Sequence, residues 1–92
     1  MNLENKVVLI TGAGLPNGIG AGIARCFANE KAKVVVTDLD ASIVDETATS
    51  LPTDALGLVA DAASQAAMDE AVDKTIDKFG GLDVLVNNAG VG

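Results

Sequence analysis

A glycine-rich segment follows the first apolar run of the chain. Residues 11–20 read Thr-Gly-Ala-Gly-Leu-Pro-Asn-Gly-Ile-Gly, directly after the Val-Val-Leu-Ile of residues 7–10. Glycine lets a backbone turn tightly and approach another group closely, and a helix that starts there presents unpaired N–H groups to negative charge. The segment is typical of a pyrophosphate site, although a plain strand-to-helix turn is the alternative, and Asn17 is placed to be the N-cap of the helix. The residues predicted to line this site are Gly12, Asn17, Gly18, Ile19 and Gly20.

Carboxylates follow the next two apolar runs. Asp38 lies 18 residues beyond Gly20, close to the ~20 expected for an acidic residue that accepts hydrogen bonds from an adenosine ribose. A carboxylate there repels a 2′-phosphate, and Leu39 beside it supplies no cation to hold one, so the position favours NAD over NADP. The alternative for Asp38 is a solvated turn residue. Asp61 and Ala62 follow the third run, where they either contact the adenine edge or form an ordinary strand-to-helix turn.

The expected elements bring these residues to one edge of a sheet. Continuous apolar runs predict strands at 7–10, 33–37, 56–60 and 84–86, and helical spacing of apolar residues predicts helices at 18–30, 43–51 and 68–79. We expect Asp40 to be the N-cap of the second helix. The order βαβαβαβ predicts an α/β fold, a Rossmann-like open parallel sheet in strand order 3-2-1-4 that stops after strand four. Ligands bind at the carboxyl ends of such strands.

Composition narrows the class of protein. The chain has 92 residues, which predicts a single nucleotide-binding domain over 1–92. Its hydrophobic share is 49% with only 2% aromatic residues, which suits parallel strands covered by helices. The net charge is −7 and the six basic residues are scattered, so we expect neither nucleic acid nor a membrane as a partner. We predict no metal site, because Asp69, Asp73 and Asp77 lie along one solvated helix flank.

The single cysteine bears on location and chemistry. Cys26 excludes an internal disulfide and fits a reducing compartment. The chain has no His to activate the thiol, so we expect Cys26 to be a small buried residue of the first helix. The run at 7–10 is too short for a signal peptide or a membrane span, so the cytoplasm is the expected location.

Taken together, these motifs resemble the N-terminal half of the short-chain dehydrogenase/reductase family over essentially the whole chain. The resemblance rests on Thr11-Gly12 with residues 18–20, on Asp38 and Asp61, and most specifically on Asn-Asn-Ala-Gly at 87–90. In that family the tetrapeptide ends the fourth strand, steadies the sheet and lines the cofactor site, which adds Asn88, Ala89 and Gly90 to the predicted site. Five residues separate Gly12 from Gly18 where the family has three, so the turn is longer here.

The resemblance implies NAD-dependent transfer of hydride to or from an alcohol or ketone, for example a 3-oxoacyl thioester. The family's catalytic Ser, Tyr and Lys would lie beyond Gly92, and the chain has no Tyr, so we assign no catalytic residue and expect the chain alone to be inactive. One alternative is a non-catalytic nucleotide-binding module. A methyltransferase-like domain is the other, but it expects an acidic residue where Thr11 stands and leaves 87–90 unexplained. A P-loop is excluded, because no Lys-Ser or Lys-Thr follows the glycines.

The predicted sheet leaves its fourth strand at an edge. Residues 84–86 are apolar, and only Asp83 is close enough to discourage pairing with another chain. We therefore expect the 92-residue chain to self-associate or remain partly molten unless a partner supplies the missing half of the fold.

Overall fold

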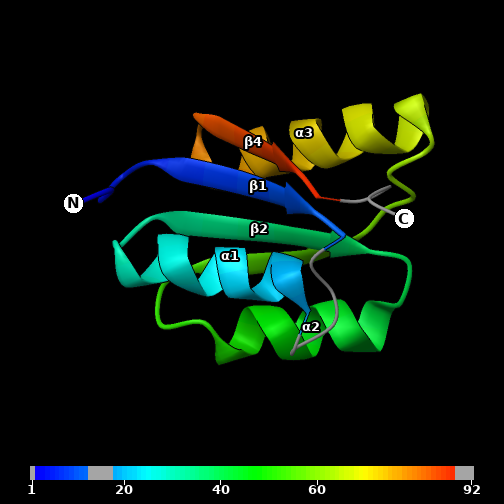
Figure 1. Ribbon diagram of the computed structural model, residues 1–92. Helices are drawn as coiled ribbons and strands as arrows, with labels where there is room; N and C mark the ends of the chain where they lie inside the picture. The colour runs from blue at the N-terminus through cyan, green and yellow to red at the C-terminus, as the bar shows by residue number, and fades with distance from the viewer. Residues whose placement is uncertain (1, 13–17, 89–92) are drawn as a thin grey trace.

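Four apolar strands form one parallel sheet. The computed structural model describes residues 2–12 and 18–88. The strands are β1 (Val7–Thr11), β2 (Lys33–Asp38), β3 (Ala55–Val59) and β4 (Val84–Asn87), in the order β3-β2-β1-β4. Three helices connect them: α1 (Ile19–Asn29), α2 (Ala41–Ser50) and α3 (Gln65–Phe79). The predicted fold class, strand order and direction are confirmed (Figure 1).

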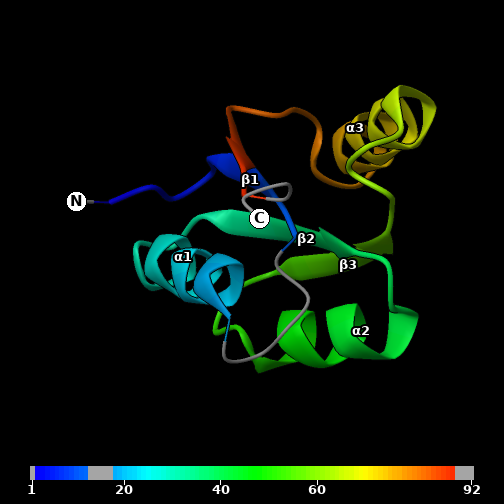
Figure 2. The same cartoon turned by 45° about the vertical axis from the view of Figure 1, so that its right-hand side comes forward.

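Helices α1 and α2 cover one face of the sheet and α3 covers the other (Figure 2). Alternate residues of a strand point to opposite faces, so the core divides into two layers. One hydrophobic cluster joins the sheet to α1 and α2, and its buried members are Val8, Ile10, Ala24, Ala28, Ala32, Val34, Val36, Val44 and Leu51. Leu9 and Val35 are fully buried but lie outside this cluster, on the α3 face.

The helical spacing of Ile19, Ile23, Cys26 and Phe27 predicts that these residues of α1 face the core, and this prediction is wrong in part. The buried residues of this helix are small: Gly20, Ala21, Ala24 and Ala28. Ile23 and Phe27 are partly buried against the core, but Ile19 is 78% exposed and Cys26 is also exposed, not buried as predicted. The physical reason is that small side chains let α1 approach β1 and β2 closely, which turns the larger ones to the flanks of the helix.

Helix α3 covers its face of the sheet only in part. It contacts β1 and β2, and its buried residues are Ala71 and Thr75. The apolar residues whose helical spacing predicted this helix are half-buried at Met68, Val72 and Phe79, and Ile76 is 43% exposed. The main contacts of α3 with the sheet are to β1 and β2, and Leu85 of β4 is exposed beside it.

The helix termini follow local chemistry. Asp40 is the N-cap of α2, as predicted, and its Oδ1 accepts hydrogen bonds from the N–H groups of Ser42 and Ile43. The Ser42 hydroxyl also donates to this carboxylate and is the main reason that the pKa of Asp40 lies below its usual value. The N-cap of α1 is Gly18, where we expected Asn17; Asn17 itself lies outside the described residues. Glycine takes the extended cap conformation at little cost.

The helices found in the described parts of the chain lack the length and apolar character that a membrane crossing requires.

Candidate functional site

The carboxyl ends of the strands enclose a cavity of about 330 Å³. Parallel strands all end at the same edge of a sheet, as the arrowheads in Figure 1 show, so residues far apart in the sequence meet there. The residues that line the cavity are Gly12, Asp38, Leu39, Ala60, Asp61, Ala62, Ala63 and Asn87. Five of them, Gly12, Asp38, Leu39, Asp61 and Ala62, were predicted for the site from the sequence.

Asp38 is the last residue of β2, and its position is set by backbone contacts on both sides. Its carbonyl accepts a hydrogen bond of 3.0 Å from the N–H of Ala60, which ties the end of β2 to the residue after β3. Its Oδ1 accepts a hydrogen bond of 2.7 Å from the N–H of Leu39. The carboxylate is therefore held at the cavity by its own neighbour in the chain, while the Leu39 side chain is largely exposed beside it.

Asp61 also lines the cavity and lies on the turn between β3 and α3. Its Oδ1 accepts a hydrogen bond of 2.9 Å from the N–H of Ala63, and its carbonyl accepts one of 2.9 Å from the N–H of Ser64. Such a turn orients the carboxylate without help from distant residues. Ala62 and Ala63 have small side chains, so the wall beside the carboxylate leaves room for a flat group.

A hydrogen-bonded tie joins the ends of β1 and β4. The Thr11 hydroxyl lies 3.1 Å from Oδ1 of Asn87 and accepts a hydrogen bond of 3.1 Å from the N–H of Asn88. The Asn88 amide donates to the Gly12 carbonyl over 3.2 Å. Asn88 thus ties Gly12 to the end of β4, and among the residues described it is Asn87 that lines the cavity at this end. Thr11 is buried, whereas Asn88 is half-buried and Asn87 is exposed, so only the Thr11 end of the tie is shielded from water.

The glycine turn is described at its two ends. Gly12 has a φ of 66°, in the left-handed region where a side chain would be strained. Gly18 caps α1, Ile19 is exposed and Gly20 is buried, but none of these three lines the cavity. The predicted site residues Asn17, Ala89 and Gly90 lie outside the described residues.

The sequence reasoning missed two residues that line the cavity, Ala60 and Ala63, and it left Asn87 out of the predicted site residues although Asn87 belongs to the tetrapeptide at 87–90. It also gave no positioning role to Thr11, which orients the end of β4. Their position in the sequence could have indicated them, because each lies within a few residues of a strand end, where side chains converge. Alanine carries no chemical signal of its own, so its contribution of shape is visible only in three dimensions.

The described residues gather no group of three or more His, Cys, Asp and Glu side chains that could hold a metal ion.

Comparison with known proteins decides the family. The family model described as short chain dehydrogenase matches residues 6–92. The chain belongs to this family. The methyltransferase-like alternative is therefore wrong, and the resemblance seen in the sequence is confirmed.

Relatives within the family are dehydrogenases and reductases. The chain is 42% identical to galactitol 2-dehydrogenase of Agrobacterium fabrum, covering 99% of this chain and 35% of that protein. It is 44% identical to meso-2,3-butanediol dehydrogenase of Serratia marcescens, covering 99% and 36%. The crystal structure of 3-ketoacyl-(acyl-carrier-protein) reductase from Brucella melitensis complexed with NADH superposes with a TM-score of 0.90 at 46% identity, covering 99% of this chain and 36% of that one. The chain thus spans little more than a third of the length of these relatives.

Proposed function

We propose that this chain binds NAD(H) as the nucleotide-binding part of an NAD-dependent short-chain oxidoreductase. The observation that carries the proposal is the cavity with Asp38 at its wall. A carboxylate accepts two hydrogen bonds from the vicinal hydroxyls of a ribose, and it repels the extra phosphate of NADP. None of the described residues that line the cavity is cationic, so none of them would compensate that repulsion. Its volume of about 330 Å³ suits the adenosine end of a dinucleotide.

Different residues would contact different parts of the dinucleotide. Asp38 would accept from the ribose, and Asp61 with Ala62 and Ala63 would border the adenine. The cap residue of α1, Gly18, brings no side-chain acceptor to the first N–H groups of that helix, which suits a pyrophosphate at its positive end. The hydrogen bonds among Thr11, Asn88 and Gly12 hold the ends of β1 and β4 together on the remaining side.

The bound nicotinamide would supply the hydride chemistry, acting between an alcohol and a ketone such as a 3-oxoacyl thioester. This chain's part is to bind and orient the dinucleotide. We assign no proton donor among its 92 residues, because it contains neither Tyr nor His. The chain alone should therefore give no increase in NADH absorbance with NAD and a panel of secondary alcohols. Turnover that a substitution within this chain abolishes would overturn the assignment.

Isothermal titration with NAD and with NADP tests the cofactor. We expect NAD to bind at least about tenfold more tightly, since one repulsive charge contact at a partly buried site is worth about 1.4 kcal/mol or more. The variant Asp38→Ala should reduce the difference in affinity between NAD and NADP. Asp45→Ala removes an exposed carboxylate of α2 outside the cavity and should leave the preference unchanged. Equal affinity of the unsubstituted chain for both dinucleotides would contradict the proposal.

We also propose that the 92-residue chain self-associates through β4. Val84 and Leu85 are exposed on this edge strand. The nearest charge, Asp83, is already engaged: its Oδ2 accepts a hydrogen bond of 2.9 Å from the N–H of Val7, and its N–H donates to the Val7 carbonyl. Because this carboxylate is hydrogen-bonded to the start of β1, it does little to discourage another chain from pairing with β4.

The cysteine content supports a proposal about the compartment. Cys26 is the only cysteine and its side chain is exposed. A free exposed thiol persists in a reducing environment, so we propose the cytoplasm as the location.

A further inference from the structure

Strand β3 is bonded to the sheet on one side only. At its start the Asp54 carbonyl accepts a hydrogen bond of 3.2 Å from the N–H of Val34, and past its end the N–H of Ala60 donates to the Asp38 carbonyl over 3.0 Å. In a parallel ladder every second residue of a strand faces the same neighbour. Even-numbered residues of 54–60 therefore turn their backbone groups toward β2.

The odd-numbered residues turn theirs outward. The N–H and C=O groups of Ala55, Gly57 and Val59 point to the outer side of β3, where the described residues form no further strand of the sheet. All three residues are at least partly exposed, and Val59 is 56% exposed. This row of donors and acceptors is a template for one more strand.

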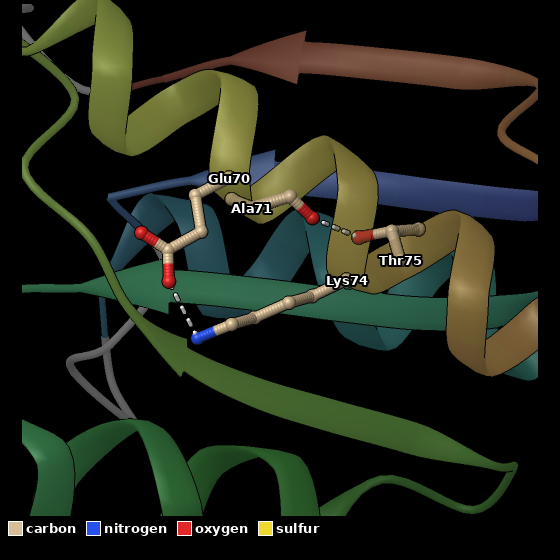
Figure 3. Close-up of polar contacts among 4 residues, drawn as sticks. All are labelled: Glu70, Ala71, Lys74 and Thr75. Atoms are coloured by element: carbon tan, nitrogen blue, oxygen red, sulfur yellow. Dashed lines mark hydrogen bonds and ion pairs between the residues drawn. The ribbon is translucent and has the colours of Figure 1, made fainter.

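A shallow notch of about 30 Å³ borders this edge on the α3 side. Its lining residues are Leu58, Val59, Ala67, Glu70, Ala71 and Lys74. Glu70 and Lys74 leave the same side of α3 and form an exposed ion pair of 3.0 Å, seen in Figure 3. Exposed pairs on a helix contribute little to stability, so Glu70 can exchange Lys74 for an incoming cation at small cost.

Acidic residues predominate in the sequence around this edge, and Lys74 of α3 is the one cation among the residues that line the notch. Residues 34–73, which include α2, β3 and the first part of α3, contain no Lys or Arg. They carry nine of the chain's 13 acidic residues: Asp38, Asp40, Asp45, Glu46, Asp54, Asp61, Asp69, Glu70 and Asp73. A second copy that offered its own β3 edge would bring the same acidic residues and be repelled, whereas a basic segment would be attracted.

We propose that the outer edge of β3 binds an extended peptide segment rich in Lys and Arg, which adds to the sheet as a further strand. The outward backbone groups of β3 supply the hydrogen bonds, and Asp54 and Glu70 pair with alternate cationic side chains. The proposal does not depend on cofactor binding, since neither Ala55, Gly57 nor Val59 lines the cavity at the strand ends.

Amide hydrogen exchange by NMR on the 92-residue chain tests the strand addition. The probe is a synthetic Lys-Val-Lys-Val-Lys-Val-Lys peptide, with Glu-Val-Glu-Val-Glu-Val-Glu as the control. We expect the basic peptide to slow exchange of the outward amides of Ala55, Gly57 and Val59 at least about tenfold, leaving Leu56 and Leu58, already bonded to β2, unchanged. Slowing by both peptides, by neither, or without this alternation would overturn the proposal.

Variants separate strand addition from charge attraction. Val59→Pro removes an outward N–H without removing a bond to β2, so peptide affinity by fluorescence anisotropy should fall at least about tenfold, while Val59→Ala keeps the donor and should bind normally. If Val59→Pro does not fold, Glu70→Lys decides: it should weaken binding severalfold more than Asp77→Lys, a charge reversal elsewhere on α3. Binding that survives both Val59→Pro and Glu70→Lys contradicts the proposal. So does self-association that Val59→Pro abolishes, because the occupant would then be a second copy.

Discussion

The two faces of the sheet are closed to different degrees. On the face under α1 and α2, Val8, Ile10, Val34 and Val36 pack into a continuous cluster with alanines of α1 and Val44 of α2. On the other face α3 lies across β1 and β2, burying Leu9 and Val35 with only two buried residues of its own. There Leu85 of β4 is 54% exposed.

The face under α1 and α2 contributes mainly to stability, whereas the α3 face includes a residue that holds the site together. Apolar area removed from water is concentrated under α1 and α2, so that face should carry most of the hydrophobic stabilisation. The α3 face holds buried polar side chains, including Thr11, Thr37 and Thr75. One of them, Thr11, holds the residues of the site together. Substitutions on the two faces should therefore have different consequences.

The largest expected effect comes from the closed face. Ile10 is fully buried in the cluster, and Ile10→Ala should lower the free energy of unfolding by about 3 kcal/mol through lost burial and a cavity. Leu85→Ala on the open face should cost less than about 1 kcal/mol, because most of that side chain is already in water. Urea unfolding followed by circular dichroism measures both. Equal losses would mean that the faces are equivalent.

A smaller loss of stability is expected from a substitution at the contact between α2 and β3. A Cβ built on Gly57 would lie 2.7 Å from the carbonyl oxygen of Val44, so α2 packs on β3 backbone to backbone. Gly57→Ala should force α2 outward and destabilise the chain by about 2 kcal/mol. Gly22→Ala is the control: the nearest atom, of Arg25, is 3.9 Å away, and the change within α1 should stabilise by about 0.7 kcal/mol. A stable Gly57→Ala variant would show that this contact is loose.

Self-association should depend on the open face. Leu85→Lys places a charge on the β4 edge and should weaken self-association about tenfold, or by about 1.4 kcal/mol. Val59→Lys places the same charge on the edge already surrounded by acidic residues and should leave self-association unchanged. Size-exclusion chromatography with light scattering over a range of concentrations makes the measurement. A monodisperse monomer of the unsubstituted chain would contradict the β4 interface.

The smallest expected change in stability concerns the buried hydroxyls of Thr37 on β2 and Thr75 on α3. The Thr37 hydroxyl is fully buried and has no hydrogen-bond partner within the described structure, so Thr37→Val should raise the free energy of unfolding by about 1 kcal/mol. The Thr75 hydroxyl donates to the Ala71 carbonyl over 2.8 Å, as Figure 3 shows, so Thr75→Val should bring no gain. Paired thermal unfolding curves test this. A loss of stability in Thr37→Val would point to a polar partner for that hydroxyl.

Much of the fold could be predicted from the sequence. The apolar runs are short, continuous and separated by helical patterns, which specifies parallel strands with crossovers, and the order β3-β2-β1-β4 followed. Asp40 was predicted as a cap because a carboxylate two and three residues before backbone N–H groups makes a local bond. The burial of Cys26 was not predicted correctly, since hydrophobic type does not reveal which side of α1 can come close to the strands.

For the site, the sequence by itself determined which chemical groups stand at the strand ends. Asp38, Leu39, Asp61 and Gly12 are within a few residues of an apolar run, and a parallel sheet brings such ends together whatever the details. Only the tertiary structure decided how those groups are held and what shape they enclose. The hydrogen bond from Asn88 to the Gly12 carbonyl depends on the register between β1 and β4. These two strands lie more than seventy residues apart in the sequence. Patterning sets which side chains share a face, but hydrogen bonds are made only at distances that the packing of the whole sheet establishes.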